Sequence, residues 1–148
     1  MKTQLMAAAL VLITASTAWS QAAPSETAAK AAKEPGAQVM PSGLVFRALK
    51  EGSGASPQAT DKVRVHYRGT FPDGKEFDSS YSRGQPAEFP LDRVIKCWTE
   101  GVQKLKVGGK AKLTCPPDIA YGERGAGGVI PPNATLQFEV ELLAIAGR

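Results

Sequence analysis

The sequence predicts an α+β fold in which a curved antiparallel sheet wraps around one short helix. Most of the chain between residues 44 and 145 divides into short segments in which apolar and polar residues alternate, as in strands with one buried and one solvated face. Only residues 96–106 carry apolar residues at the spacing of an amphipathic helix. One helix is thus available to cover the apolar face of the sheet. The 148 residues, 43% of them hydrophobic, suit a single domain.

Residues 1–20 have the features of a secretory signal peptide. Lys2 precedes the apolar run LMAAALVLI, and small residues lead to an expected cleavage site after Ser20. The run is too short to span a bilayer, so we expect an exported protein without a stable membrane anchor. Residues 21–40 are rich in Ala, Pro and small polar residues, and we expect a flexible linker or a frayed helix there. The folded domain is expected to cover residues 41–148.

Five segments of the expected domain have the spacing of strands: residues 44–49 (LVFRAL), 62–71 (KVRVHYRGTF), 87–91 (AEFPL), 110–115 (KAKLTC) and 135–145 (TLQFEVELLAI). In the second segment, Val63, Val65 and Tyr67 point to one face and the intervening Arg and His side chains to the other. The Pro-Asp-Gly turn follows this segment and precedes Phe77. The last segment turns four apolar side chains inward: Leu136, Phe138, Val140 and Leu142. The shared alternation indicates a sheet with one dry face.

The expected helix carries a large side chain near its start. Trp98, Val102 and Leu105 recur at the i, i+4, i+7 spacing that puts them on one face, and Gly108 and Gly109 end the segment. A Trp in the first turn of so short a helix has two interpretations. It fills the core of this small domain, or it forms the bottom of a site that another molecule enters.

Several kinds of active site are disfavoured by the residues present. The chain has one His and two Cys, whose spacing matches no zinc site, and His66 is expected to be a solvated strand residue rather than a ligand or base. The glycine-rich segment GERGAGG lacks the lysine and the following helix of a phosphate-binding loop. The lysines of KLKVGGKAK alternate with apolar residues without aromatic residues between them, which favours a solvated face over nucleic-acid binding. The sequence thus indicates no metal, no cofactor and no nucleic-acid partner.

Aromatic residues recur along the whole domain: Tyr67, Phe77, Phe89, Trp98, Tyr121 and Phe138. Composition alone is compatible with a core built from these rings. It is also compatible with a concave aromatic pocket that holds few polar groups. Six large rings are more than one short helix needs beneath it, and an acid, Asp78, directly follows Phe77.

Five motifs of the sequence are similar to those of a known family. In order, they are V-x-Y-x-G (65–69), D-G-x-x-F-D-S-S (73–80), V-I-x-x-W-x-E-G (94–101), A-Y-G (120–122) and I-P-P-N-A-T-L-x-F-x-V-E-L (130–142). Together they resemble the FKBP family of macrolide-binding peptidyl-prolyl cis–trans isomerases, from about residue 41 to residue 146. The resemblance implies a five- to six-stranded half-barrel around a helix, with Trp98 at the bottom of a proline pocket.

The resemblance also implies roles for individual residues. Asp78, Tyr121 and the backbone N–H of Ile95 are the expected polar groups of the catalytic site. The expected substrate-binding residues form the apolar walls and the rim: Tyr67, Phe77, Arg83, Phe89, Val94, Trp98, Val129, Ile130 and Phe138. Proline-containing polypeptides are the implied substrates, and rapamycin-type macrolides are the implied inhibitors.

The implied reaction suits these residues because rotation about an X–Pro bond breaks no bond and requires no nucleophile. The amide loses its resonance over a barrier of about 18–20 kcal/mol. Apolar surroundings tolerate the twisted amide, whose dipole is smaller, better than the planar one. Tyr121 is expected to donate to the substrate carbonyl, and the Ile95 N–H to hold the next peptide unit. Asp78 is expected to fix Tyr67 by a hydrogen bond, since no proton transfer is needed.

The expected function is therefore isomerisation of X–Pro bonds, which assists the folding of exported proteins. We expect a monomer that works in a bacterial periplasm. The alternative is a non-catalytic chaperone or binding module on the same fold, which would act through the loop at residues 118–132.

Cys97 and Cys115 are the only cysteines, and they are expected to form a disulfide. Export and an even number of cysteines both favour pairing. Cys115 is expected to point inward from its strand, and Cys97 lies at the start of the helix that the sheet wraps. The alternative is a pair of buried free thiols. A disulfide here would contribute about 3 kcal/mol by the chain-entropy estimate.

Overall fold

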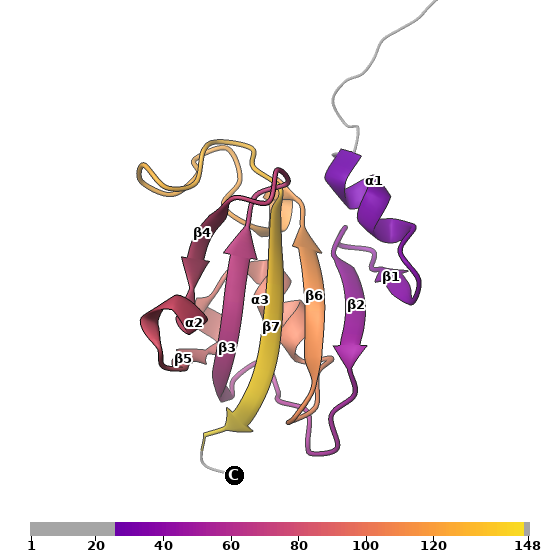
Figure 1. The fold of residues 1–148 in the computed structure, drawn as a ribbon, viewed down its shortest axis with the longest axis vertical. Coiled ribbons are helices and arrows are strands. Elements are labelled where there is room, and N and C mark those ends of the chain that lie inside the picture. The colour runs from indigo at the N-terminus through magenta and orange to yellow at the C-terminus, as the bar shows by residue number, and fades with distance from the viewer. Residues whose placement is uncertain (1–25, 147–148) are drawn as a thin grey trace, which may run out of the picture.

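The computed structural model describes residues 26–146 and contains one seven-stranded antiparallel sheet with short helices (Figure 1). The strands are β1 (Ala37–Val39), β2 (Val45–Lys50), β3 (Lys62–Thr70), β4 (Glu76–Ser79), β5 (Ala87–Pro90), β6 (Lys110–Cys115) and β7 (Leu136–Ile145). The helices are α1 (Glu26–Ala32), α2 (Ser80–Arg83) and α3 (Lys96–Val102), with two 3₁₀ turns, η1 (Leu91–Arg93) and η2 (Pro117–Ile119).

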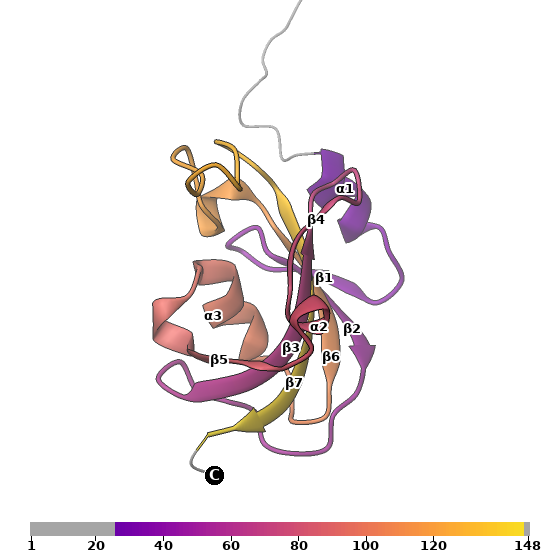
Figure 2. The same ribbon diagram turned by 60° about the vertical axis from the view of Figure 1, so that its left-hand side comes forward.

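The sheet has the order β1-β2-β6-β7-β3-β4. The long strand β3 pairs with β7 along one edge, and its other edge is shared, because residues 62–65 pair with β5 and residues 68–70 pair with β4. Figure 2 shows that the sheet is curved and that α3 lies against one of its faces. The predicted α+β class, a curved antiparallel sheet around a short helix, is confirmed.

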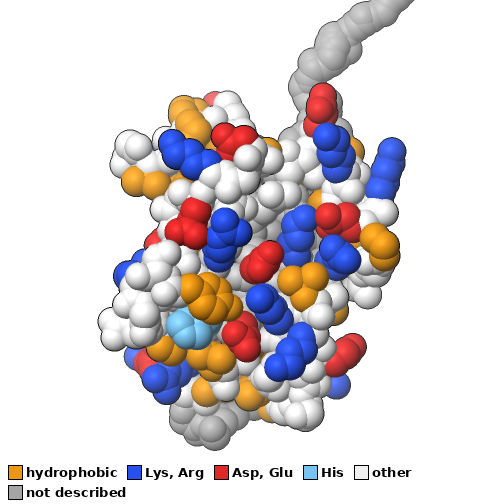
Figure 3. Space-filling view, in the orientation of Figure 1, with side chains coloured by type: hydrophobic (Ala, Val, Ile, Leu, Met, Phe, Trp, Pro, Cys, Tyr) orange, Lys and Arg blue, Asp and Glu red, His pale blue; other side chains and the backbone are white. Residues whose placement is uncertain are grey.

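The core lies between α3 and the apolar face of the sheet. Val63 and Val65 are fully buried and Tyr67 is nearly so, as the alternation in β3 predicts, and the inward side chains of β7 are buried in the same way. The opposite face carries Lys and Arg side chains interspersed with Asp and Glu (Figure 3). On this face the Nζ of Lys110 lies 3.6 Å from the Oε1 of Glu139. This balance of opposite charges agrees with a solvated outer face.

The number and length of the elements differ in part from the sequence prediction. The sequence predicts five to six strands and one helix, whereas the structure has seven strands and also forms α1 and α2. The main helix ends at Val102 rather than at residue 106. Its end tightens because the N–H groups of Lys104 and Leu105 donate to carbonyls three residues back. This turn still buries Leu105, so the third apolar residue of the predicted helix face reaches the core although the α-helix has already ended.

Residues 26–39 form α1 and β1, so for this part the structure agrees with the predicted alternative of a helix more than with a flexible linker over residues 21–40. Ala28 and Ala31 of α1 are buried where the helix contacts β1, β2 and β6, and β1 pairs with β2. The Glu34 carboxylate lies 3.0 Å from the Nζ of Lys112. The sequence signal for this packing is weak, because alanines let a helix approach a sheet without the large apolar residues that mark a buried face.

The predicted signal peptide, residues 1–20, lies outside the described residues. Among residues 26–146, no helix is long and apolar enough to cross a membrane.

Candidate active site

A pocket of about 450 Å³ lies where the sheet, the start of α3 and the loop before β7 meet. Its lining comes from β3, β4, β5 and β7, from η1 and the two residues after it, from α3 and from the loop after η2. The lining residues are Tyr67, Phe77, Asp78, Phe89, Arg93, Val94, Ile95, Trp98, Tyr121 and Phe138. Segments far apart in the chain therefore build one mostly aromatic cavity.

Trp98 forms the bottom of this pocket. The rings of Tyr67, Phe89 and Phe138 lie 5.1, 5.5 and 5.4 Å from its indole ring, at interplanar angles of 82°, 90° and 87°. Three rings thus stand at nearly right angles to the indole and form walls around it. The indole Nε1 is buried and has no hydrogen-bond partner among the described residues, so ring contacts hold this side chain in place. This geometry supports the interpretation that Trp98 forms the bottom of a binding site, although the residue also packs in the core.

Asp78, Tyr67 and Arg83 form a hydrogen-bonded cluster at one wall. The Tyr67 hydroxyl donates to Asp78 Oδ2 at 2.5 Å, and it accepts from Arg83 Nη2 at 2.9 Å. Arg83 Nη1 lies 2.6 Å from Asp78 Oδ1, which also accepts from the Ser79 N–H at 2.9 Å. The predicted hydrogen bond between Asp78 and Tyr67 is confirmed. Arg83 is not among the residues that line the pocket; it is hydrogen-bonded to Asp78 and Tyr67, which do line it.

These contacts set the protonation of the cluster. Partial burial alone would raise the pKa of Asp78, but the hydrogen bonds from Tyr67 and Arg83 outweigh it and hold the pKa below its ordinary value of 3.8. Burial, followed by the hydrogen bond to Asp78, raises the pKa of Tyr67 above its ordinary value of 10.0. At neutral pH the site therefore contains a carboxylate and a neutral phenol. A carboxylate held in this way is suited to positioning Tyr67 rather than to donating a proton.

Two donors at the pocket remain available to a bound molecule. The Ile95 carbonyl accepts from the N–H groups of Trp98 and Thr99, but the Ile95 N–H has no partner among the described residues. Tyr121 is 40% exposed, and its hydroxyl likewise has no partner in residues 26–146. Both groups line the pocket, so they are able to bind the carbonyls of an extended peptide.

Val129 and Ile130 lie beside the main pocket rather than in it. They line a second cavity of about 420 Å³, which shares Phe77, Asp78 and Tyr121 with the first. Ile130 is buried, whereas Val129 is 56% exposed. The loop that carries them is held by the reciprocal hydrogen bonds between the backbones of Ala126 and Ile130.

Arg93 is the one lining residue that the sequence interpretation missed. It stands beside Asp92 between the apolar residues Leu91 and Val94, and such a pair of opposite charges resembles any solvated turn. Its charged side chain gives no signal of its own, and only its position directly before Val94 and Ile95 could have indicated that it lines the pocket.

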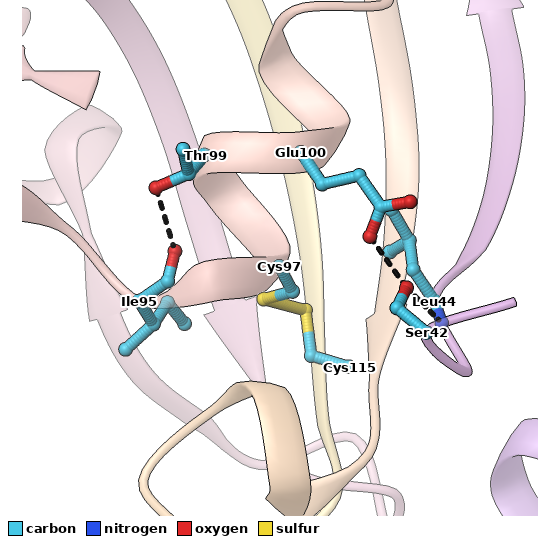
Figure 4. Close-up of a disulfide and its surroundings, with 7 residues drawn as sticks. All are labelled: Ser42, Leu44, Ile95, Cys97, Thr99, Glu100 and Cys115. Atoms are coloured by element: carbon cyan, nitrogen blue, oxygen red, sulfur yellow. Dashed lines mark hydrogen bonds between the residues drawn. A yellow bond between two sulfur atoms is a disulfide. The ribbon is translucent and has the colours of Figure 1, made fainter. Parts of the chain in front are cut away.

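A disulfide joins Cys97 to Cys115 and ties the start of α3 to the end of β6 (Figure 4). The predicted bridge is thus present, with a Cα–Cα distance of 5.8 Å, and both cysteines are fully buried. Because Cys97 precedes Trp98, the bridge anchors the residue next to the bottom of the pocket. Nearby, the Ser42 hydroxyl donates to Glu100 and fastens the outer side of the same helix.

Comparisons with known proteins agree with this fold and pocket. A family model for FKBP-type peptidyl-prolyl cis-trans isomerases matches residues 54–143. The chain is 53% identical over 116 residues to the FKBP-type peptidyl-prolyl cis-trans isomerase FkpA of Escherichia coli K12, a match that covers 78% of this chain and 43% of FkpA. It is 56% identical over 103 residues to FK506-binding protein 1 of Dictyostelium discoideum, which covers 68% of this chain and 96% of that protein.

The crystal structure of Escherichia coli FkpA superposes with a TM-score of 0.79 at 51% identity, covering 81% of this chain and 56% of that one. The chain thus spans about half the length of this bacterial relative. The family model and the nearly complete coverage of the Dictyostelium protein show that the chain belongs to the FKBP-type peptidyl-prolyl cis-trans isomerase family.

Proposed function

We propose that this chain accelerates the cis–trans rotation of X–Pro peptide bonds in polypeptides. The observation that carries the proposal is the aromatic pocket around Trp98, whose lining includes two donors that have no partner in the described part of the chain. The names and sequences of the relatives support the same activity.

Rotation requires the X–Pro amide to lose its resonance over a barrier of about 18–20 kcal/mol. A prolyl ring held against the Trp98 indole between the perpendicular rings lies in apolar surroundings. A planar amide has a large dipole that such surroundings solvate poorly, whereas the twisted amide has a smaller one. Binding that favours the twisted form over the planar forms lowers the barrier.

The polar groups orient the peptide in this scheme. The Tyr121 hydroxyl donates to the carbonyl that precedes the proline, and the Ile95 N–H donates to the carbonyl that follows the ring. Asp78 and Arg83 keep Tyr67 in its wall position. Phe77, Phe89, Val94 and Phe138 enclose the ring, while Val129 and Ile130 contact the flanking substrate residues.

We further propose that the protein is exported and assists the folding of proteins in a bacterial periplasm as a monomer. The buried disulfide supports export, because such bonds persist in oxidising compartments. Burial of Ala28 and Ala31 within the chain supports a monomer, since the apolar side of α1 is used internally. Cell fractionation and light scattering of the purified protein test these two points.

The central test is the rate of isomerisation of a short X–Pro peptide with and without the chain. We expect acceleration, and we expect a rapamycin-type macrolide to abolish it by occupying the pocket. The matched control is Trp98→Leu, which removes the bottom of the pocket. A folded wild-type protein that binds peptides but gives no acceleration would instead support a non-catalytic chaperone or binding module acting through the loop at residues 118–132.

A further inference from the structure

The pocket carries one charge that no other group in residues 26–146 neutralises. Asp78 and Arg93 are the two lining residues that are charged at neutral pH. Asp78 is paired with Arg83, whose Nη1 lies 2.6 Å from its Oδ1. Arg93 is exposed, and within the described part of the chain it forms no ion pair and no side-chain hydrogen bond. The uncompensated charge at the pocket is therefore positive.

The position of Arg93 indicates which part of a substrate it meets. It ends η1, two residues before Ile95, and both residues line the same pocket. The proposed function assigns the Ile95 N–H to the carbonyl that follows the prolyl ring. A peptide bound in this way leaves the pocket along the segment that contains Arg93, while Tyr121 contacts the part before the proline.

The charged residues close to Arg93 in the sequence line a different cavity. Asp92 and Lys96 line a groove of about 900 Å³ that adjoins the pocket at Val94, and neither lines the pocket itself. Asp92 is thus poorly placed to neutralise Arg93 on the side where a substrate binds. Lys96 offers a matched positive charge close to the pocket but outside it.

We propose that Arg93 gives this isomerase a preference for polypeptides that carry an acidic side chain directly after the proline. The inference rests on the proposed function, because it assumes that X–Pro peptides occupy the pocket. An exposed ion pair of this kind corresponds to about a two- to fivefold gain in kcat/KM. The gain must weaken in concentrated salt, since the screening length falls from about 10 Å at 0.1 M to about 3 Å at 1 M.

The test uses end-blocked peptides of one otherwise uncharged sequence, which differ only in having Glu, Gln or Lys directly after the proline. A second set places the same residues directly before the proline. For the full chain we expect a Glu-to-Gln ratio of kcat/KM of about two to five in the first set at low salt, and a ratio near one at 1 M salt. The second set should show no such ratio.

Variants then assign the preference to Arg93. Arg93→Gln should bring the ratio to about one, Arg93→Glu should favour the Lys peptide, and Arg93→Lys should keep the preference for Glu. Lys96→Gln, the matched control, should keep it as well. Each comparison uses a ratio between peptides, so a general loss of activity in one variant does not affect the conclusion.

Three results would overturn the proposal: a ratio near one in the wild-type chain, a ratio that persists in Arg93→Gln, or a preference confined to the set with the acid before the proline. Binding of the same peptides, measured by calorimetry, separates this inference from the proposed function. If no peptide is isomerised, the proposed function fails, and a Glu-over-Gln binding preference that Arg93→Gln removes still supports the role of Arg93. Equal binding would then reject that role too.

Discussion

Tyr67 joins the two parts of the site in a single side chain. Its ring is one of the walls around Trp98, and its hydroxyl lies between Asp78 and Arg83. The ring cannot rotate away from the pocket without breaking both hydrogen bonds, so the polar cluster keeps an apolar wall in position. Polar residues in this site therefore act largely by fixing the shape of the cavity.

Tyr121 has a different role, because its hydroxyl has no partner within the described residues. Tyr121→Phe should lower kcat/KM for a neutral X–Pro peptide by about two- to tenfold, the loss expected for one neutral hydrogen bond. The free energy of unfolding should not change, since the side chain is 40% exposed. Tyr81→Phe is the control, because Tyr81 is similarly exposed but lies outside the pocket. A Tyr121→Phe protein that fails to fold would show a structural role instead.

The lowered pKa of Asp78 makes part of the stability depend on pH. A depressed pKa in the folded state stabilises the protein fully above the ordinary value of 3.8, and this contribution is lost as the pH falls through the lower, folded value. Asp78→Asn should therefore destabilise the protein at pH 7, and its difference from wild type should shrink below pH 3.8. Urea unfolding of both proteins at pH 7 and at a pH below 3.8 measures this difference in stability. A difference that stays constant would contradict the role of the carboxylate charge, and Asp92→Asn controls for the loss of an exposed carboxylate.

At the scale of elements, the pocket depends on close packing between the strands and on the attachment of α3. Gly69 of β3 leaves room for the Phe77 ring, because a Cβ at this position would lie 2.6 Å from Phe77 Cζ. Phe77 then meets Phe138 at a ring distance of 5.6 Å. On the other side, the Cys97–Cys115 disulfide joins α3 to β6 beside Trp98.

The disulfide should stabilise the fold by about 3 kcal/mol on the chain-entropy estimate. The double variant Cys97→Ala and Cys115→Ala should lose about this amount, and reductant should lower the stability of the wild type but not of the variant. Thiol titration of the denatured protein, purified without reductant, checks the bridge directly. Two reactive thiols in that protein would show that the bond is not formed.

At the scale of the whole molecule, the N-terminal segment of residues 26–39 extends the sheet and covers part of it. α1 contacts β1, β2 and β6, whereas the pocket is built from β3, β4, β5, β7 and the region around α3. No residue of the segment 26–39 lines the pocket. Docking of α1 is therefore expected to affect local stability more than catalysis.

Ala31→Glu tests this separation by placing a carboxylate at a side chain that is only 3% exposed. An unpaired charge is costly to bury, so α1 should detach from the sheet. Amide hydrogen exchange should rise across residues 26–39, while isomerase activity stays at the wild-type level. Ala29→Glu, on the exposed side of the same helix, is the control. Unchanged protection in Ala31→Glu, or an equal rise in both variants, would contradict the packing of α1.

The sequence alone was sufficient for the features that repeat along the chain or depend on residue type. Alternation in β3 and β7 identified the buried face, because each strand turns every second side chain toward the core. The aromatic side chains and the motifs around them predicted nine of the ten lining residues of the pocket, Arg93 being the exception. The cysteine pair was predictable because the export that the first twenty residues predict and an even number of cysteines both favour a bridge.

Other features were decided only when distant segments met. Arg93 lines the same pocket as residues of β4 and β7, and its own charged side chain gave no sign of this in the sequence, although the predicted lining residues Val94 and Ile95 follow it directly. Arg83 is not a lining residue, and from α2 its guanidinium donates to Asp78 and Tyr67 instead. The segment at residues 26–39 folds because alanines fit closely against the sheet, a contact that leaves no periodic pattern of large apolar residues. The periodicity of apolar residues shows which face of a helix or strand is buried. Which other element covers that face depends on how the whole chain packs.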